Sequence, residues 1–139
     1  MTTTITTKVN IILITHETVG TALLHAAKMA LNELPLSTTV MAITHQDEPD
    51  DIVAKLKKHV EALIRKNSEQ QFLILTDLFG ATPSNIASRL QKCEQKDKIE
   101  IVAGLNLPML IRVMNYATLS LHDLTQKAVS GGKDGIISY

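Results

Sequence analysis

A histidine and an aspartate occupy matching positions after two apolar segments, and together they could support nucleophilic chemistry. His16 follows the apolar run 9–14 and Thr15, and Asp77 follows the apolar run 71–76. A carboxylate that accepts a hydrogen bond from one imidazole nitrogen fixes the tautomer, and it leaves the lone pair of the other nitrogen free to attack. The two residues therefore predict a nucleophilic histidine, provided that the fold brings their side chains together.

The residues that follow Asp77 favour a phosphoryl group as the electrophile. Gly80 lets the backbone approach a ligand closely, and Thr82 offers a hydroxyl at the start of a predicted helix. The free N–H groups at that helix start would meet the oxygens of an anion, and a second helix is expected to start beside His16. We therefore expect Gly80, Ala81 and Thr82 to bind the phosphoryl group.

Two further residues are candidates for supporting positions in the site. Thr15 directly precedes the histidine, and Asn106 stands where another predicted helix begins, primarily as its N-cap. The chain contains no Walker-type lysine loop, so ATP is not expected as the direct donor. The expected donor is a phosphohistidine on another protein, and this chemistry requires neither a metal nor a cofactor.

His45 leaves a metal site open as an alternative. It ends the second predicted strand, so His16, His45 and Asp77 could approach one another as ligands. We expect no metal, because two histidines and one aspartate in separate loops occur readily by chance. A metal hydrolase would instead need zinc bound by His16 and His45.

Strand-like and helix-like segments alternate along the chain and must position these residues. Near-continuous apolar runs, typical of strands covered on both faces, occur at 9–14, 39–43, 71–76 and 99–104. Helical patterns lie between and after these runs, at 18–34, at 49–67, from Thr82 as the N-cap, at 107–117, and at 121–130 up to Gly131 and Gly132.

This alternation predicts one α/β domain over residues 1–139, with a doubly wound, mostly parallel open sheet of four strands and helices on both faces. Residues 135–139 are expected to add a short C-terminal strand, and residues 1–7 to form a loose tail. In such sheets ligands bind beyond the carboxyl ends of the strands, where the strand order reverses. The candidate site residues fall in the loops at those ends.

Composition excludes several classes of protein. Lys+Arg and Asp+Glu number 14 each, so no net field draws the chain to nucleic acid or anionic lipid. The apolar runs are far shorter than the ~20 residues of a membrane span, and the Thr-rich start lacks the features of a signal peptide. We therefore expect a cytoplasmic protein without membrane insertion. The single Cys93 is expected to be a small apolar core residue.

Three segments resemble the IIA domains of the mannose class (mannose, fructose and sorbose) of the bacterial phosphoenolpyruvate-dependent sugar phosphotransferase system. They are ITH at 14–16, LTDLFGATPSN at 75–85 and AGLNLPML at 103–110, with a weaker match at 130–136. The resemblance covers nearly the whole chain. It implies a phosphotransferase in which His16 accepts a phosphoryl group from the phosphocarrier protein HPr and passes it to a IIB protein.

The resemblance also implies roles for other residues and an assembly. Asp77 would orient the imidazole, Thr82 and nearby backbone N–H groups would contact the phosphate, and the last strand of a homodimer would pair with the partner's sheet. Sugar-transporting members commonly have glycine directly after the active histidine, where this chain has Glu17. This departure favours an alternative, a phosphorylation-dependent regulatory binding module not coupled to sugar uptake. The acceptor is expected to be a separate protein.

Overall fold

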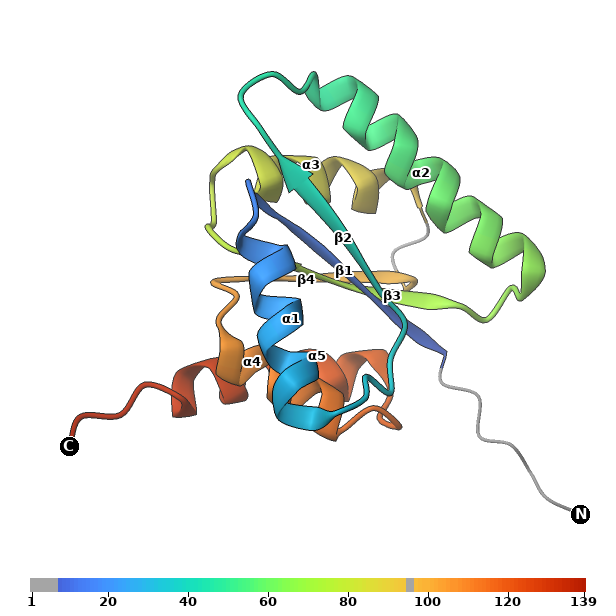
Figure 1. The fold of residues 1–139 in the computed structure, drawn as a ribbon. Coiled ribbons are helices and arrows are strands. Elements are labelled where there is room, and N and C mark those ends of the chain that lie inside the picture. The colour runs from blue at the N-terminus through green and yellow to red at the C-terminus, as the bar shows by residue number, and fades with distance from the viewer. Residues whose placement is uncertain (1–7, 95–96) are drawn as a thin grey trace, which may run out of the picture.

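A parallel sheet with helices on both of its faces forms the body of the molecule (Figure 1). The computed structural model describes residues 8–94 and 97–139, so the tail expected at 1–7 lies outside the described residues. The elements follow in the order β1 (Val9–His16), α1 (Val19–Leu31), β2 (Thr38–Ile43), α2 (Pro49–Lys66), β3 (Gln71–Thr76), α3 (Thr82–Cys93), β4 (Ile99–Ala103), α4 (Leu107–Asn115) and α5 (Leu121–Asp134).

The four strands lie in the order β2-β1-β3-β4, and every neighbouring pair is parallel. Strand β2 lies on one side of β1, and β3 and β4 follow on its other side. The strand order therefore reverses between β1 and β3. The register places Ile14 of β1 beside Thr76 of β3. The predicted doubly wound sheet is therefore confirmed, and its reversal point lies where the candidate histidine and aspartate follow.

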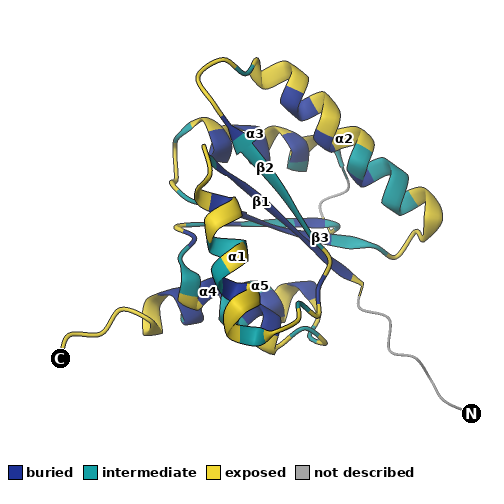
Figure 2. Cartoon of the chain, viewed as in Figure 1, coloured by how far each residue is buried: buried dark blue, intermediate teal, exposed yellow. Residues whose placement is uncertain are grey.

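Each face of the sheet carries its own apolar core. Side chains from alternate strand positions pack against α1, α4 and α5 on one face, among them Ile11, Leu13, Leu73 and Leu75. The intervening side chains pack against α2 and α3 on the other face, among them Ile12, Ile14, Phe72 and Ile74. Burial on both faces accounts for the near-continuous apolar runs in the sequence, and Figure 2 shows the buried character of the central strands.

Helix α5 does not end where the sequence predicted. It continues through Gly131 and Gly132 to Asp134, and both glycines are buried. A Cβ atom on Gly131 would lie 2.4 Å from the Cβ of Arg112, and one on Gly132 would lie 2.9 Å from the Cε of Met109. The predicted helix end is therefore wrong, because the two glycines allow close packing of α5 on α4 and this packing outweighs their low helix propensity.

The last strand expected at 135–139 is absent from this single chain. Residues 136–139 have no regular secondary structure, and their side chains are exposed. A terminal segment of this kind forms a strand only if a sheet edge supplies the hydrogen-bond partners for its backbone. Among the described residues, this segment pairs with no strand of the sheet.

Three smaller predictions also need correction. Helix α3 begins at Thr82 with Ala81 at the N-cap position, because Pro83 is tolerated anywhere in the first turn. Helix α1 ends at Leu31, since Asn32 adopts the left-handed φ of 66° that asparagine tolerates. Cys93 is exposed on the last turn of α3 and is not a core residue.

No helix within residues 8–94 and 97–139 combines the length and the apolar character needed to cross a membrane.

Replacing Gly131 with alanine should lower the free energy of unfolding by about 1–3 kcal/mol, because its Cβ would overlap the Cβ of Arg112, which no side-chain rotation can move. Urea denaturation followed by circular dichroism measures the change. Lys133→Ala, at an exposed position of the same helix, is the control and should change stability by less than about 0.5 kcal/mol. Equal stability of the two variants would show that α4 and α5 do not approach this closely.

Candidate functional site

Asp77 holds His16 through two hydrogen bonds to a single carboxylate oxygen. Its Oδ2 lies 3.0 Å from the backbone N of His16 and 3.0 Å from the Nδ1 of the same residue. An ionised carboxylate only accepts hydrogen bonds, so Nδ1 carries the proton and Nε2 keeps its lone pair. Residues 61 positions apart in the chain thus orient one imidazole at the carboxyl ends of the two central strands.

The two side chains differ in their contact with solvent. The side chain of His16 is 44% exposed, whereas that of Asp77 is 13% exposed. The Oδ1 of Asp77 is buried and has no hydrogen-bond partner among the described residues. A buried oxygen without a hydrogen-bond partner costs the folded protein free energy. The imidazole of His16 is therefore open to another molecule, while the carboxylate that orients it is shielded.

The backbone directly after His16 is strained. Glu17 adopts a φ of 44°, in the left-handed region that costs a residue other than glycine about 1 kcal/mol. Its N–H donates to the carbonyl of Ile43 at the end of β2, over 2.9 Å. The glycine common at this position in the family that the sequence resembles would relieve this strain, so Glu17 stands here at a conformational cost.

A close contact fixes the start of α1 behind the histidine. The backbone N of Gly20 donates to the Oγ1 of Thr15 over 2.8 Å, and both residues are buried. A Cβ on Gly20 would lie 2.8 Å from that same oxygen. Thr15, expected as a site residue, thus ties β1 to α1 with its side chain inside the protein.

A cavity of about 250 Å³ opens beside the histidine where β1 and β2 end and α2 and α3 begin. It is lined by His16, Glu17, Ile43, Thr44, His45, Asp47, Pro49 and Thr82. No lysine or arginine lines it among the described residues. The first-turn N–H groups of α3 have no partner within the helix, and Thr82 brings this helix start to the cavity. Such a position suits an anion of the size of phosphate.

The three residues expected to bind phosphate differ in their placement. Thr82 lines the cavity, whereas Gly80 and Ala81 form the turn that leads to it. Gly80 has a φ of 84°, which glycine adopts without strain, and a Cβ placed there would meet nothing within 4 Å. Conformation, and not lack of space, therefore accounts for glycine in this turn.

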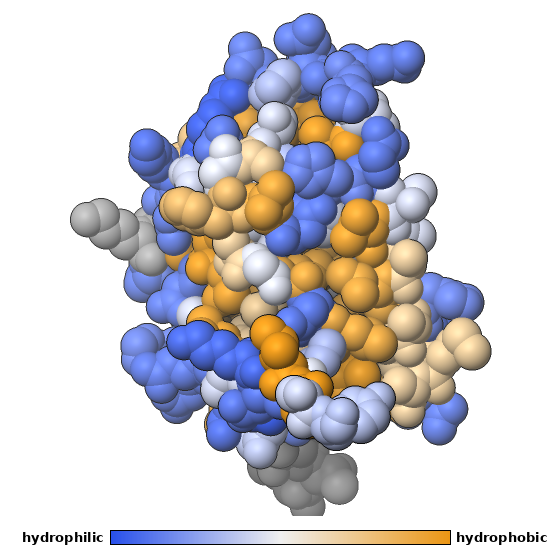
Figure 3. All heavy atoms as spheres, turned by 90° about the vertical axis from the view of Figure 1, so that its left-hand side faces the viewer, coloured by the Kyte–Doolittle hydropathy of each residue, from blue (hydrophilic) through white to orange (hydrophobic). Residues whose placement is uncertain are grey.

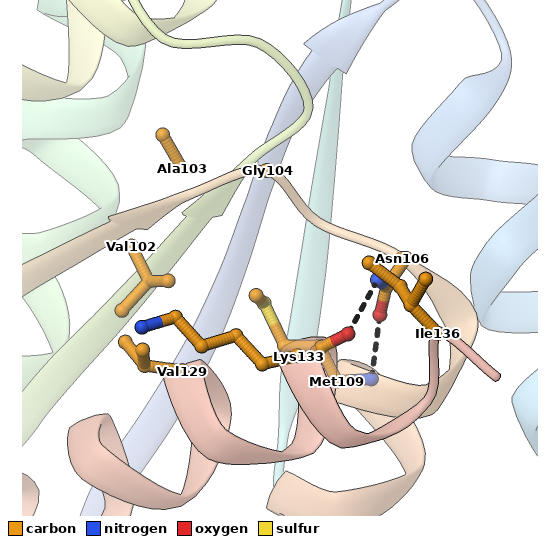
Figure 4. A pocket seen from close by; sticks show the side chains of 9 residues that line it. Val102, Ala103, Gly104, Asn106, Met109, Val129, Lys133 and Ile136 are labelled. Carbon is orange, nitrogen blue, oxygen red and sulfur yellow. Dashed lines mark hydrogen bonds between the residues drawn. The ribbon is translucent and has the colours of Figure 1, made fainter.

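Asn106 lies away from the cavity beside His16. Its Oδ1 accepts from the backbone N of Met109 over 2.9 Å, and its Nδ2 donates to the carbonyl of Gly132 over 3.1 Å. Figure 4 shows both bonds beside a different pocket, of about 190 Å³, between the end of β4 and helix α5. The predicted N-cap role is confirmed, and the same side chain joins α4 to α5.

His16, His45 and Asp77, considered above as alternative metal ligands, are not arranged as a metal site. Within the described ranges, no group of three or more His, Cys, Asp or Glu side chains could hold a metal ion. His45 nevertheless lines the same cavity as His16. The geometry therefore gives the zinc hydrolase no support but makes His45 a neighbour of the nucleophile.

Asp47 is a cavity residue that the sequence analysis did not single out. Its Oδ2 accepts from the backbone N of Thr44 over 2.8 Å and from the Thr44 Oγ1 over 3.1 Å. Aspartate and threonine side chains commonly bond to nearby backbone in turns, so Thr44 and Asp47, just after the end of β2, are a signal for such a turn. The turn shapes the loop that carries His45 along the cavity.

Comparison with known proteins places this geometry in a family. A sequence model described as PTS system fructose IIA component matches residues 10–129. The mannose-specific EIIAB component of Escherichia coli strain K12 is 30% identical over 83 residues, which are 58% of this chain and 25% of that protein. The matched region thus spans a quarter of that relative. The sorbose-specific EIIA component of Lacticaseibacillus casei is 30% identical over 115 residues, covering 82% of this chain and 78% of that protein.

Solved structures agree over almost the whole length. The mannose/sorbose specific IIA subunit of the phosphotransferase system from Enterococcus faecalis has a TM-score of 0.80 at 25% identity and covers 95% of each chain. The phosphotransferase system component EIIA from Streptococcus agalactiae has a TM-score of 0.77 at 25% identity, covering 94% of this chain and 96% of that one. Because the family's sequence model matches most of the chain, the chain belongs to the family of PTS fructose IIA components, and the predicted family is confirmed.

Proposed function

We propose that the chain is a cytoplasmic phosphoryl carrier of the phosphotransferase system, in which His16 accepts a phosphoryl group from phospho-HPr and passes it to a separate IIB protein. Membership of the IIA family supports the class of activity. The single observation that carries the proposal for this residue is the hydrogen bond between the Nδ1 of His16 and the Oδ2 of Asp77.

In the proposed step, the Nε2 of His16 attacks the phosphorus of the donor's phosphohistidine in line with the bond that breaks. A new N–P bond forms on His16, and the electron pair of the old bond returns to the donor's imidazole. The proton on Nδ1 stays in place, and Asp77 stabilises the positive charge that grows on the ring. The hydroxyl of Thr82 and the first-turn N–H groups of α3 would contact the phosphoryl oxygens.

Release reverses the same bond changes. A nucleophile of the acceptor attacks the phosphorus, the bond to Nε2 breaks, and its electron pair returns to His16. The half-exposed imidazole supports this exchange, because donor and acceptor must each reach the same nitrogen. No metal or cofactor takes part in the proposed steps.

A second candidate function is favoured by Glu17. A carboxylate in the cavity of the histidine disfavours a dianionic phosphoryl group, as would suit a regulatory module whose partner senses whether His16 is modified. Adding IIB proteins to the phosphorylated chain separates the two functions. Transfer of the label to a IIB protein supports the carrier, whereas loss of label with no gain by a IIB protein supports the regulator.

Labelling of His16 is the first test of the common step. With phosphoenolpyruvate, enzyme I and HPr, the wild-type chain should take up one phosphoryl group and His16→Ala none. Asp77→Asn should be labelled roughly 100-fold more slowly, the range typical of losing one oriented electrostatic partner. Quenched time courses on phosphate-affinity gels measure these rates. His25→Ala, exposed on α1, is the matched control and should be labelled like wild type. A wild-type chain as unlabelled as His16→Ala would refute the proposal.

Docking of the donor is expected to use apolar side chains beside the site. Figure 3 views the side toward which the carboxyl ends of the strands point, where apolar surface gathers. On the loop that follows Asp77, Leu78 is 59% exposed and Phe79 is 83% exposed. Exposed aromatic side chains often dominate the energy of protein interfaces.

Phe79→Ala should therefore raise the KM for phospho-HPr by about fivefold or more, the loss expected when a central aromatic contact is removed, while kcat stays near its wild-type value. Initial labelling rates measured over a range of HPr concentrations separate the two constants. Met29→Ala removes another exposed apolar side chain, on α1, and should leave both constants unchanged. A reduced kcat with an unaltered KM for Phe79→Ala would place Phe79 outside the docking surface.

A homodimer is also part of the proposal. Ile136 and Ile137 are 79% and 70% exposed, and β4 has β3 as its only strand neighbour among the described residues. An open strand edge and an apolar terminal segment could supply each other's missing partners between two copies.

The full chain should therefore sediment as a dimer, and a chain that stops after Gly135 should sediment as a monomer, because removal of 136–139 deletes the pairing segment. Analytical ultracentrifugation measures both masses. Ile136→Asp with Ile137→Asp keeps the chain length and should weaken the dimer in the same way. A dimer that survives truncation would show that another surface forms it.

A further inference from the structure

We infer that His45, in its protonated form, is the cation that offsets Glu17 and binds the phosphoryl group carried by His16. The inference rests on the proposed function of His16 as the phosphorylated residue. It assigns a role to two side chains that the transfer step described above does not use.

The sheet register brings these side chains to one cavity. His16 pairs with Ile43 across β1 and β2, and the N–H of Glu17 donates to the carbonyl of Ile43 over 2.9 Å. His45 follows two residues beyond Ile43, so it extends from the strand end that anchors Glu17. His16, Glu17 and His45 all line the same cavity of about 250 Å³.

The charges in this space require a cation when phosphate is present. A phosphoryl group adds between about 1.5 and 2 negative charges near neutral pH, and two acidic residues, Glu17 and Asp47, already line the cavity. Apart from His16, His45 is the one described cavity residue that can become positively charged. Its imidazole can therefore supply the compensating charge.

Three other carboxylates in or near the cavity already have partners. Asp47 accepts two hydrogen bonds from Thr44, and Asp77 accepts two from His16. At the start of α2, Asp50 pairs with Arg89 over 2.7 Å. Glu17 is the cavity carboxylate with no such partner in the described part of the chain, so it is the one available to attract a protonated His45.

The strained backbone of Glu17 provides an independent observation. Residues held in the left-handed region at a site mark positions where the side chain or the geometry serves a function. Glycine would adopt the φ of 44° freely but would leave the cavity without this carboxylate. In the proposed arrangement, the charge of a protonated His45 offsets that of Glu17 when the phosphoryl group is present.

This arrangement makes retention of phosphate depend on pH. Imidazoles take up a proton between about pH 8 and pH 5. The protonated form of His45 stabilises phosphorylated His16, so transfer toward this chain becomes more favourable as pH falls through that range. A lysine at position 45 would keep the stabilising charge without the pH dependence.

The test measures how label divides at equilibrium between phospho-HPr and this chain at pH 6 and pH 8. His45→Gln should lower the equilibrium constant for transfer to the chain about fivefold at pH 6, the upper range for a charge pair open to water, and little at pH 8. His45→Lys should retain wild-type labelling at pH 6 and keep it at pH 8. Each variant is compared with wild type at the same pH, so that the pH dependence of HPr itself cancels. His25→Gln, which removes another exposed imidazole on α1, is the control and should be labelled like wild type at both pH values.

Glu17→Gln, made alone and together with His45→Gln, measures how strongly Glu17 and His45 depend on each other in their effect on labelling. Removing the carboxylate should raise labelling more in the His45→Gln background than in the wild-type background, where the imidazolium already offsets it. Equal effects in both backgrounds would overturn the pairing. If His45→Gln fails to fold, the pH profile of His45→Lys tests the same charge.

The inference and the proposed function fail in different ways. A wild-type chain that is labelled on His16, together with a His45→Gln variant that is labelled like wild type at both pH 6 and pH 8, overturns only the role of His45. A wild-type chain that takes no label at either pH overturns both.

Discussion

The contact between Asp77 and His16 is the interaction on which the site depends, and it exists because β1 and β3 are neighbours. One carboxylate oxygen accepts from the main chain and from the ring of the same histidine, both at 3.0 Å. The main-chain bond positions the carboxylate relative to the strand, and the ring bond positions the imidazole relative to the carboxylate. An orientation held in this way leaves Nε2 as the nitrogen that faces an incoming group.

Partial positive charge reaches this site from the oriented backbone dipoles of a helix start. No lysine or arginine lines the cavity among the described residues, and the start of α3 supplies the partial positive charge of its free N–H groups instead. A carrier that must both accept and release phosphate gains from such moderate stabilisation, because a dense cluster of fixed cations would hold the group too tightly.

Glycines serve two different physical purposes in this fold. Gly80 supplies a left-handed backbone in the turn before α3, with open space where a side chain would stand. Gly131 and Gly132 lie inside a helix, where the absence of a side chain allows α5 to pack closely on α4. Glu17 shows the reverse case, since a charged residue that lines the cavity adopts a glycine-like backbone conformation.

Much of the fold was predictable from the sequence, because its signals are local or follow from burial. Apolar runs and helical spacing indicated the four strands, the five helices and the parallel sheet, and the strand-end positions of His16 and Asp77 indicated the site. The errors lie where tertiary contacts outweigh local preference. Helix α5 passes its two glycines because α4 packs against them, and residues 135–139 form no strand because a strand needs a partner edge.

The sequence by itself determined the residue types of the site and the elements that carry them, since an imidazole, a carboxylate and a helix start have the same chemistry in any fold. Only the tertiary structure decided that one oxygen of Asp77 accepts from the backbone N and the Nδ1 of His16, that Glu17 is strained, and that His45 lines the same cavity as His16 and Glu17. The physical reason is that distances between strand ends depend on strand order and register. Contacts between residues distant in the chain set these, and local sequence patterns do not encode such contacts.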